Sequence, residues 1–251
     1  MQPAAGAITV FAAGSLRAPF TQAARAFEAE APGLRIDFVF GASGLLRERI
    51  AGGERADLFA SANLAHPQAL GDAHGYGPTR VFARNALCAL VRRGLAVTPE
   101  TLVQAMLDPA VRLGTSTPGS DPSGDYAFAF FEHLERCGAA PPGAAAALAA
   151  KALCLTGAPG VPKPPGSGNV YGRLVASGAA DVFLTYRTNA GIATAEQPGL
   201  QWVEIGPHLN VGAAYGLTVR GDAPPAAQRL ADALCGGAGQ AALHDAGFLP
   251  P

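Results

Sequence analysis

Residues 38–63 read FVFGASGLLRERIAGGERADLFASAN and contain a strand, a helix and a second strand in succession. Residues 34–40 place apolar side chains at alternate positions, as a half-buried strand does. Residues 45–50 carry leucine and isoleucine at helical spacing, and residues 57–61 form a short apolar run. Because strands separated by helices at this spacing form βαβ units, the stretch predicts a parallel sheet covered by helices.

The segments on both sides continue the alternation of strands and helices. Upstream, residues 8–13 form an apolar strand run, and apolar side chains then recur at helical spacing until Pro32-Gly33. Downstream, the expected elements are a strand at 81–91, a helix starting at Thr98-Pro99, a strand at 111–114, a helix through Tyr126 and Leu134, an Ala-rich helix at 143–151, a loop at 157–168 and a terminal strand around Trp202. The whole chain is therefore expected to be an α/β protein.

An internal echo indicates two related halves. Residues 49–60 read RIAGGERADLFA and residues 173–184 read RLVASGAADVFL, and the two align without a gap. Both run from the end of a short helix, through glycine, into Ala-Asp-apolar-Phe and a strand. The echo therefore predicts two similar α/β lobes, with ligand contacts just outside the strand ends.

Composition excludes several classes of protein. The 251 residues are 49% hydrophobic and 15% charged, so the chain can bury a sizeable core and is not disordered as a whole. The 18 basic and 19 acidic side chains leave a net charge of -1, whereas a nucleic-acid binder or an electrostatic membrane binder should be basic. No run approaches the ~20 apolar residues of a membrane helix. Met1–Ala7 lacks the basic and apolar regions of a signal peptide, so either the protein is cytoplasmic or a signal peptide has been removed.

Residues suited to catalysis or metal binding do not group in the sequence. The 5 histidines are scattered without HExxH spacing, and neither a G-x-S-x-G elbow nor a zinc-type Cys/His spacing occurs. The cysteines are Cys88, Cys137, Cys154 and Cys235. They could be reduced thiols or form two disulfides, with Cys137–Cys154 as the first pair to test, and Cys88 lies in an apolar run typical of core. No enzyme activity and no metal site are expected.

Four places combine a strand end, a small polar residue and a helix start: 13–16, 40–44, 120–126 and 167–170. In the first two, Ser15 and Ser43 are placed to be helix N-caps. Free N–H groups at helix starts, together with serine hydroxyls, make a donor-rich anion site without any need for lysine or arginine. Each start taken alone is explained as an ordinary helix cap, so the prediction depends on several of them at the same strand ends. Neither G-x-x-x-x-G-K-S/T nor G-x-G-x-x-G occurs, and nucleotide binding is not supported.

Three segments together resemble the molybdate-binding periplasmic proteins of ABC importers: ITVFAAGSL at 8–16, residues 38–63 as quoted above, and ADVFLTY at 180–186. The resemblance runs through the whole chain in order. It implies a type II periplasmic-binding-protein fold, in which two lobes, each a mostly parallel sheet flanked by helices, close on an oxyanion. Lobe one is expected at 1–83 and 209–251, and lobe two at 84–208.

In that family, hydroxyl and amide groups contact the anion, and the resemblance assigns this role to six residues here. They are Ser15, Ser43, Ser123 through its backbone amide, Asn169 with Val170, and Tyr186. Asp121 and Asp125 depart from the family's pattern. Asp121 could cap the helix that follows it, and both carboxylates could be ligands of a metal-like centre, but we expect both to face solvent. The stretch 187–189 receives no role.

The sequence therefore predicts a solute-binding protein that captures a tetrahedral dianion, molybdate or tungstate, for the membrane permease of an ABC importer. It is expected to be a periplasmic monomer whose signal peptide has been removed, with no nucleic-acid partner and no cofactor besides the bound oxyanion. Binding would close the two lobes by a hinge motion. Two alternatives stay open: a ligand-sensing domain of a regulator, although no basic helix-turn-helix is visible, and a binder of another oxyanion such as sulfate.

Overall fold

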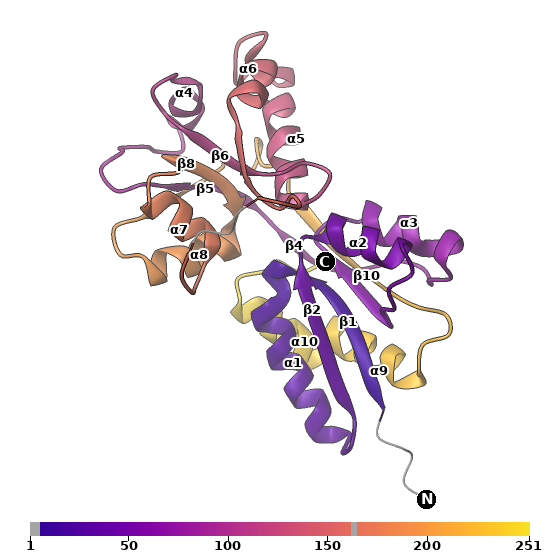
Figure 1. The fold of residues 1–251 in the computed structure, drawn as a ribbon. Coiled ribbons are helices and arrows are strands. Elements are labelled where there is room, and N and C mark those ends of the chain that lie inside the picture. The colour runs from indigo at the N-terminus through magenta and orange to yellow at the C-terminus, as the bar shows by residue number, and fades with distance from the viewer. Residues whose placement is uncertain (1–5, 162–164) are drawn as a thin grey trace, which may run out of the picture. The chain divides into compact units, whose positions relative to one another are not determined.

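Two five-stranded sheets organise the chain, each with helices on both faces (Figure 1). The structure is a computed structural model that describes residues 6–161 and 165–251. By its internal contacts the chain divides into unit 1, which runs up to Arg84 and includes Ala214–Pro251, and unit 2, Asn85–Ala213. The lobe boundaries expected from the sequence, 83/84 and 208/209, fall close to these divisions. The predicted α/β class is confirmed.

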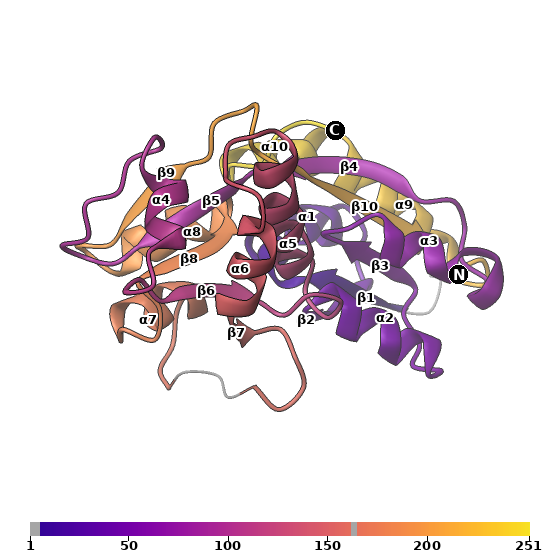
Figure 2. The same ribbon diagram turned by 90° about the horizontal axis from the view of Figure 1, so that it is seen from above.

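Unit 1 takes most of its sheet from the N-terminal third of the chain. Its strands are β1 Ala7–Ala13, β2 Arg35–Gly41, β3 Leu58–Ser61, β4 Arg80–Asn85 and β10 Ala213–Val219, and its helices are α1 Arg17–Glu30, α2 Ser43–Ala51, α3 Ala65–His74, α9 Pro225–Cys235 and α10 Gly237–Asp245. The strand order is β2-β1-β3-β10-β4, which the labels of Figure 2 follow. Strand β1 is parallel to β2 and β3, and β10 is antiparallel to β3. The predicted strand–helix–strand is therefore β2, α2 and β3, with both strands parallel to β1.

Two apolar layers hold the helices of unit 1 to its sheet. The layer under α2 and α3 comprises Phe11, Leu46, Ile50, Ala56, Phe59, Leu70 and Tyr76. On the opposite face a line of aromatic rings runs from Phe20 of α1 through Phe82 and Tyr215 to Phe248, with neighbouring ring centroids 5.6, 6.3 and 5.2 Å apart. Figure 1 shows α1, α9 and α10 together on that face. Because each buried aromatic side chain contributes roughly 2–3 kcal/mol of apolar burial, this line ties the C-terminal segment to the N-terminal sheet.

Unit 2 also contains one five-stranded sheet, and its strands follow an order equivalent to that of unit 1. Its strands are β5 Leu87–Val91, β6 Leu113–Ser116, β7 Leu153–Thr156, β8 Val182–Tyr186 and β9 Gln201–Glu204, and its helices are α4 Leu102–Leu107, α5 Pro122–Arg136, α6 Ala144–Lys151, α7 Val170–Ala176 and α8 Arg187–Glu196. The order is β7-β6-β8-β5-β9, with β6 parallel to β7 and β8 and with β5 antiparallel to β8 and β9 (Figure 2). Helices α4, α5 and α6 cover one face, and α7 and α8 cover the other.

The internal echo of the sequence corresponds to a structural repeat, α2–β3 in unit 1 and α7–β8 in unit 2. In each copy, an aspartate just before the strand makes two hydrogen bonds to the backbone of one residue in the adjacent segment of the same sheet. The Asp57 N–H donates to the Thr9 carbonyl at 2.8 Å, and its Oδ2 accepts from the Thr9 N–H at 2.9 Å. Asp181 makes both bonds with Arg112, each at 2.8 Å. The predicted likeness of the two halves is confirmed down to this pair of side chains.

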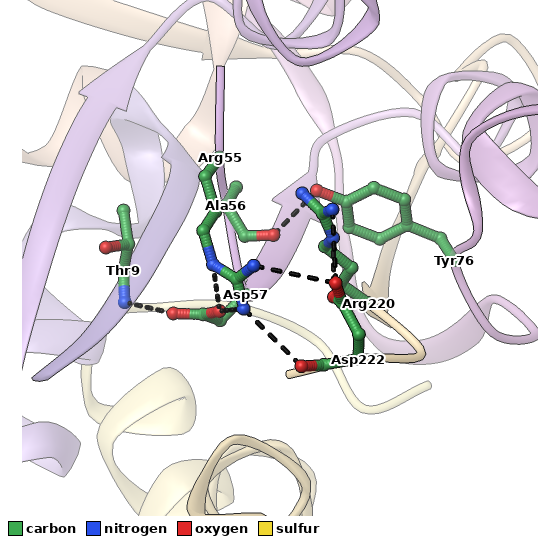
Figure 3. A network of polar contacts seen from close by, with 7 residues as sticks. All are labelled: Thr9, Arg55, Ala56, Asp57, Tyr76, Arg220 and Asp222. Carbon is green, nitrogen blue, oxygen red and sulfur yellow. Dashed lines mark hydrogen bonds and ion pairs between the residues drawn. The ribbon is translucent and has the colours of Figure 1, made fainter. Parts of the chain in front are cut away.

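Asp57 belongs to a chain of charges at the amino ends of β1 and β3 (Figure 3). Arg55 Nη2 lies 3.0 Å from Asp57 Oδ1, and its Nη1 lies 3.6 Å from Asp222 Oδ2. Arg220, directly after β10, completes the chain with its Nε 2.6 Å from Asp222 Oδ1. These groups lie where the parallel strands begin, whereas the predicted anion site lies where they end. The network therefore stabilises the sheet and is not part of the candidate site.

Asp181 occupies the equivalent position in unit 2 and has more arginine contacts. Its Oδ1 lies 2.7 Å from Arg92 Nε and 2.9 Å from Arg112 Nη2, and its Oδ2 lies 3.0 Å from Arg112 Nε. The hydrogen bonds and charge of Arg112 hold the pKa of the Asp181 carboxyl well below its usual range. The ionised carboxylate is therefore tied into the folded state of unit 2.

The expected elements differ from the structure in three respects. Residues 81–91, expected as one strand, form two strands in different sheets, because the chain leaves the first sheet at Asn85. The helix expected to start at Thr98-Pro99 begins at Leu102, since the Thr98 N–H bonds to the Thr101 hydroxyl in a turn instead. Strands β7 and β10 and helices α3, α8, α9 and α10 were not expected.

The other sequence-based expectations about local structure have clear outcomes. All four cysteines are free thiols, so the Cys137–Cys154 pair is wrong, while Cys88 lies in the core as predicted. Trp202 lies in β9, at the edge of its sheet, as expected for a terminal strand. Within the expected loop 157–168, residues 162–164 lie outside the described residues. No helix in the described part of the chain is long and apolar enough to cross a bilayer.

Candidate functional site

The two serine-bearing turns of unit 1 lie side by side. They follow β1 and β2, which are neighbouring parallel strands with Ala13 opposite Gly41 in the register. A Cβ atom added to Gly14 would lie only 4.0 Å from the carbonyl oxygen of Gly41, so the backbones of the two turns are close. Parallel strands bring their carboxyl ends to one edge of a sheet, where ligands of open α/β sheets bind. The structure therefore brings the Ser15 and Ser43 turns together at that edge.

Ser15 lies in a short 3-10 turn, Gly14–Leu16, that precedes α1. It caps no helix, because Leu16 stands at the N-cap of α1 without a side-chain hydrogen bond. Its Oγ instead lies 3.0 Å from the hydroxyl of Tyr215, a fully buried residue of β10. The N-cap prediction for Ser15 is wrong, and the hydroxyl is oriented by an aromatic side chain 200 residues away in the chain.

Ser43 is the first residue of α2 and is completely buried. The N-cap of α2 is Ala42, so the cap prediction is wrong here too. The Ser43 Oγ accepts a hydrogen bond from the Ala62 N–H at 3.2 Å, at the end of β3. A hydroxyl that accepts one hydrogen bond still carries a proton of its own to donate. Ala62 therefore orients Ser43 and leaves that proton available to a further acceptor.

In unit 2, hydroxyl groups gather at the carboxyl ends of β6 and β7. Ser116 Oγ lies 2.9 Å from Thr156 Oγ1 and donates to Ser123 Oγ at 3.4 Å. Ser116 and Ser123 are both fully buried. The position of Ser123, at the start of α5, agrees with the helix start read from the sequence. Ser116 and Thr156 extend that start into a cluster of three hydroxyls.

Asp121 does not face solvent as expected. It is the N-cap of α5, and its Oδ1 accepts from the Ser123 N–H at 3.0 Å. Burial raises the pKa of its carboxyl to about 6, against the lowering effect of the hydrogen bond from Ser123. Asp125 also turns back onto the chain, accepting from the Gly119 N–H at 2.6 Å. The backbone amide assigned to the anion is therefore occupied by a carboxylate of the same chain.

Asn169 is the N-cap of α7, at a helix start that the sequence indicated. Its Oδ1 accepts from the Gly172 N–H at 3.0 Å, and its Nδ2 donates to the Asn189 carbonyl at 3.2 Å. Val170 is the first residue of α7 and is half-buried. The Asn189 side chain in turn donates to Thr185 Oγ1 at 3.2 Å, next to the end of β8. The stretch after Tyr186, which had no role, thus connects the start of α7 to β8.

Tyr186 ends β8, and α8 begins at the next residue. It is 3% exposed, and its ring meets that of Tyr126 of α5 edge to face, with centroids 6.4 Å apart. An aromatic side chain so enclosed has little rotational freedom. Among the six assigned residues, the structure therefore groups Ser15 with Ser43 in unit 1, and anchors Ser123, Asn169, Val170 and Tyr186 at the starts of α5 and α7 and the end of β8 in unit 2.

A family model described as bacterial extracellular solute-binding protein matches residues 8–249. The chain belongs to this family. An uncharacterized protein of Pasteurella multocida is 35% identical to this solute-binding protein over 243 residues, which cover 96% of it and 98% of the relative. The molybdate-binding protein ModA of Mycobacterium tuberculosis is 38% identical over 93 residues, which cover 36% of this solute-binding protein and 35% of ModA.

Solved structures of similar proteins share the fold of this solute-binding protein. The periplasmic molybdate-binding protein of Azotobacter vinelandii aligns with a TM-score of 0.73 at 18% identity, over 97% of this chain and 99% of its own. The sulfate-binding protein SubI of Mycobacterium tuberculosis aligns with a TM-score of 0.77 at 19% identity, over 97% of this chain and 86% of its own. The predicted periplasmic-binding-protein fold and the resemblance to molybdate-binding proteins are confirmed.

Several polar groups of this solute-binding protein escaped the sequence analysis. Tyr215 is hydrogen-bonded to Ser15, and Ser116 is hydrogen-bonded to both Ser123 and Thr156. These groups lie far from the assigned residues in sequence or in strands without a local motif. Their one signal is position, because each lies in or at the end of a strand next to an assigned turn. In the part of the chain that the structure describes, no three His, Cys, Asp or Glu side chains gather as a metal site.

Proposed function

We propose that this solute-binding protein captures a tetrahedral oxyanion, molybdate or tungstate, and delivers it to the membrane permease of an ABC importer. The observation that carries the proposal is the pairing of the Ser15 and Ser43 turns at the ends of adjacent strands. Both side chains can donate a hydrogen bond. The free N–H groups at the start of α2 point outward from the N-terminal end of that helix, and they are further donors at the same edge. A fully deprotonated oxyanion has acceptors only and suits such donors.

The six assigned residues are proposed to contact the anion, with one qualification. Ser15, Ser43, Asn169 and Tyr186 can donate from their side chains, and Val170 can donate from the backbone. The Ser123 amide can do so only when Asp121 releases it. The proposal is further supported by the similarity to the molybdate-binding proteins of Azotobacter vinelandii and Mycobacterium tuberculosis.

A second candidate ligand is sulfate. The similarity to the sulfate-binding protein SubI is at least as high in TM-score as the similarity to the molybdate-binding protein of Azotobacter vinelandii. Sulfate has the same shape and charge as molybdate but is smaller, so the two compete for the same donors. We propose a periplasmic monomer in either case, in line with an extracellular family.

Added molybdate is expected to raise the melting temperature of the protein by several degrees. A ligand that binds only the folded state stabilises it by roughly 4 kcal/mol at ~1,000 times its dissociation constant. Differential scanning fluorimetry with molybdate, tungstate and sulfate measures the shift, with chloride at matched ionic strength as the control. No shift with any of the three dianions would refute the proposal, and the largest shift identifies the preferred anion.

Ser43→Ala is expected to weaken molybdate binding about ten- to a hundredfold, because it removes a hydrogen bond to a charged group worth about 1.5–3 kcal/mol. It also leaves the buried Ala62 N–H without its acceptor, so stability falls as well. Thr218→Val is a matched control, since Thr218 is buried and its hydroxyl donates to the Gly77 carbonyl at 2.7 Å. Titration calorimetry should show normal affinity for Thr218→Val. Equal loss of affinity in both variants would show that Ser43 has a structural role and does not bind the anion.

A further inference from the structure

We propose that Arg17 is an additional anion-binding residue through which this protein selects divalent over monovalent oxyanions; the inference rests on the function proposed above. Arg17 is the first residue of α1, two positions after Ser15. Its guanidinium carbon lies 4.5 Å from the ring centroid of Phe40, near the carboxyl end of β2. Arg17 thus follows the Ser15 turn directly, and its guanidinium packs on the strand that leads into the Ser43 turn.

Packing holds the guanidinium group in this place. The Phe40 ring stacks on Phe38, with centroids 4.9 Å apart and planes inclined by 14°. A guanidinium over an aromatic face is attracted by the ring and still keeps the N–H groups at its edge available. Arg17 is exposed as a residue, so these donors can meet an incoming solute. The cation is therefore held in place before a ligand arrives.

The two arginines of α2 are paired with carboxylates. Arg47 of α2 lies 3.3 Å from Glu48, and Arg49 lies 2.5 Å from Glu54. For Arg17, the described residues supply an aromatic ring and no carboxylate within ion-pair distance. The charge of Arg17 is thus not neutralised locally, in contrast to the charges of Arg47 and Arg49.

A fixed positive charge changes which ligands the turns prefer. The hydroxyls of Ser15 and Ser43 are neutral donors and hydrogen-bond to any oxyanion. The Coulomb attraction of a cation is proportional to the ligand's charge, so it is about twice as strong for a dianion as for a monoanion at the same distance. Sulfate and perchlorate are both tetrahedral and differ in charge, so together they isolate this effect.

Arg17→Gln removes the charge and keeps an amide donor. We expect affinity for molybdate and sulfate to fall about tenfold, affinity for perchlorate to fall about threefold, and the sulfate preference to shrink accordingly. Calorimetry measures the dianions, and competition against molybdate measures perchlorate. Wild-type affinity should also weaken more steeply with added potassium chloride than that of the variant, because salt screens an exposed charge.

Arg25→Gln is the matched control, since Arg25 is an exposed arginine on the same helix, two turns further from the serine-bearing turns. It should bind all three anions as the wild type does. If Arg17→Gln binds molybdate and sulfate with wild-type affinity and salt dependence, the role of Arg17 is overturned while the proposed function stands. If the wild type binds none of these anions, both are overturned.

Discussion

Replacing Asp181 by asparagine is expected to lower the free energy of unfolding of unit 2 by about 2–3 kcal/mol near neutral pH. The change removes a buried carboxylate charge that meets two arginines and the Arg112 N–H. Breaking a fully buried pair costs about 3–5 kcal/mol, and the value is smaller here because both arginine side chains are about half exposed. Denaturant unfolding followed by fluorescence suits this test, since the single tryptophan, Trp202, lies in β9 of the same unit.

The loss from Asp181→Asn should depend on pH. The pKa of Asp181 is lowered in the folded protein, mainly by the hydrogen bond from Arg112. A carboxyl with a depressed pKa contributes stability above the pKa of the unfolded chain, about 3.9, and this contribution is lost as the pH falls toward the folded-state pKa. The difference between wild type and variant should therefore be full near neutral pH and shrink below about pH 4.

Two aspartates provide controls for this result. Asp37→Asn removes an exposed pair with Arg35, 2.7 Å long, and should cost less than about 0.5 kcal/mol. Asp57→Asn changes the equivalent aspartate of unit 1, which among the described residues pairs with one arginine, Arg55, and should cost less than Asp181→Asn. Equal effects of Asp37→Asn and Asp181→Asn would contradict a special role for the buried carboxylate.

Asp121→Asn is expected to raise affinity for molybdate about tenfold at about pH 8. Asparagine keeps an oxygen that can cap α5 at the Ser123 N–H, and it removes a negative charge that repels the dianion by about 1–2 kcal/mol at protein-like dielectric. Burial raises the pKa of Asp121 to about 6, so wild-type affinity should improve as the pH falls toward that value, while the variant's affinity stays constant. Calorimetry at about pH 8 and about pH 6 measures both effects.

Phosphate should respond in the opposite direction. Near neutral pH phosphate carries a proton, and the Asp121 carboxylate can accept it, whereas a site of donors alone leaves it unpaired at a cost of about 1–3 kcal/mol. Asp121→Asn should therefore reduce phosphate affinity relative to molybdate. Asp125→Asn is the control, because Asp125 bonds to the Gly119 N–H and should leave selectivity unchanged. Strong selection against phosphate by the wild type at about pH 8 would argue that Asp121 lies outside the site.

Local patterns were enough to predict much of the fold. The alternation in 34–40, the helical spacing in 45–50 and the run at 57–61 became β2, α2 and β3. The echo of RADLFA in AADVFL predicted a repeat that extends to the hydrogen bonds of Asp57 and Asp181. Periodicity within one element indicates which of its faces is buried, so these elements can be predicted without knowing what they pack against. The helix start at 167–170 was predictable for the same reason, because the Asn169 cap bonds within three residues.

Other features were decided by the tertiary structure, because they depend on partners far apart in the sequence. Ser15 and Ser43 look like helix caps locally, yet their hydroxyls bond to Tyr215 and Ala62. For the side chain of Asp121, the sequence allowed two positions, as the cap of the following helix or facing solvent. The sequence could not decide between these two positions, because the outcome depends on how deeply the folded unit buries the carboxyl. Sequence alone thus predicted most of the elements and the strand edge that we propose as the anion site, while long-range packing determined how the hydroxyls and carboxylates at the ends of those strands are paired.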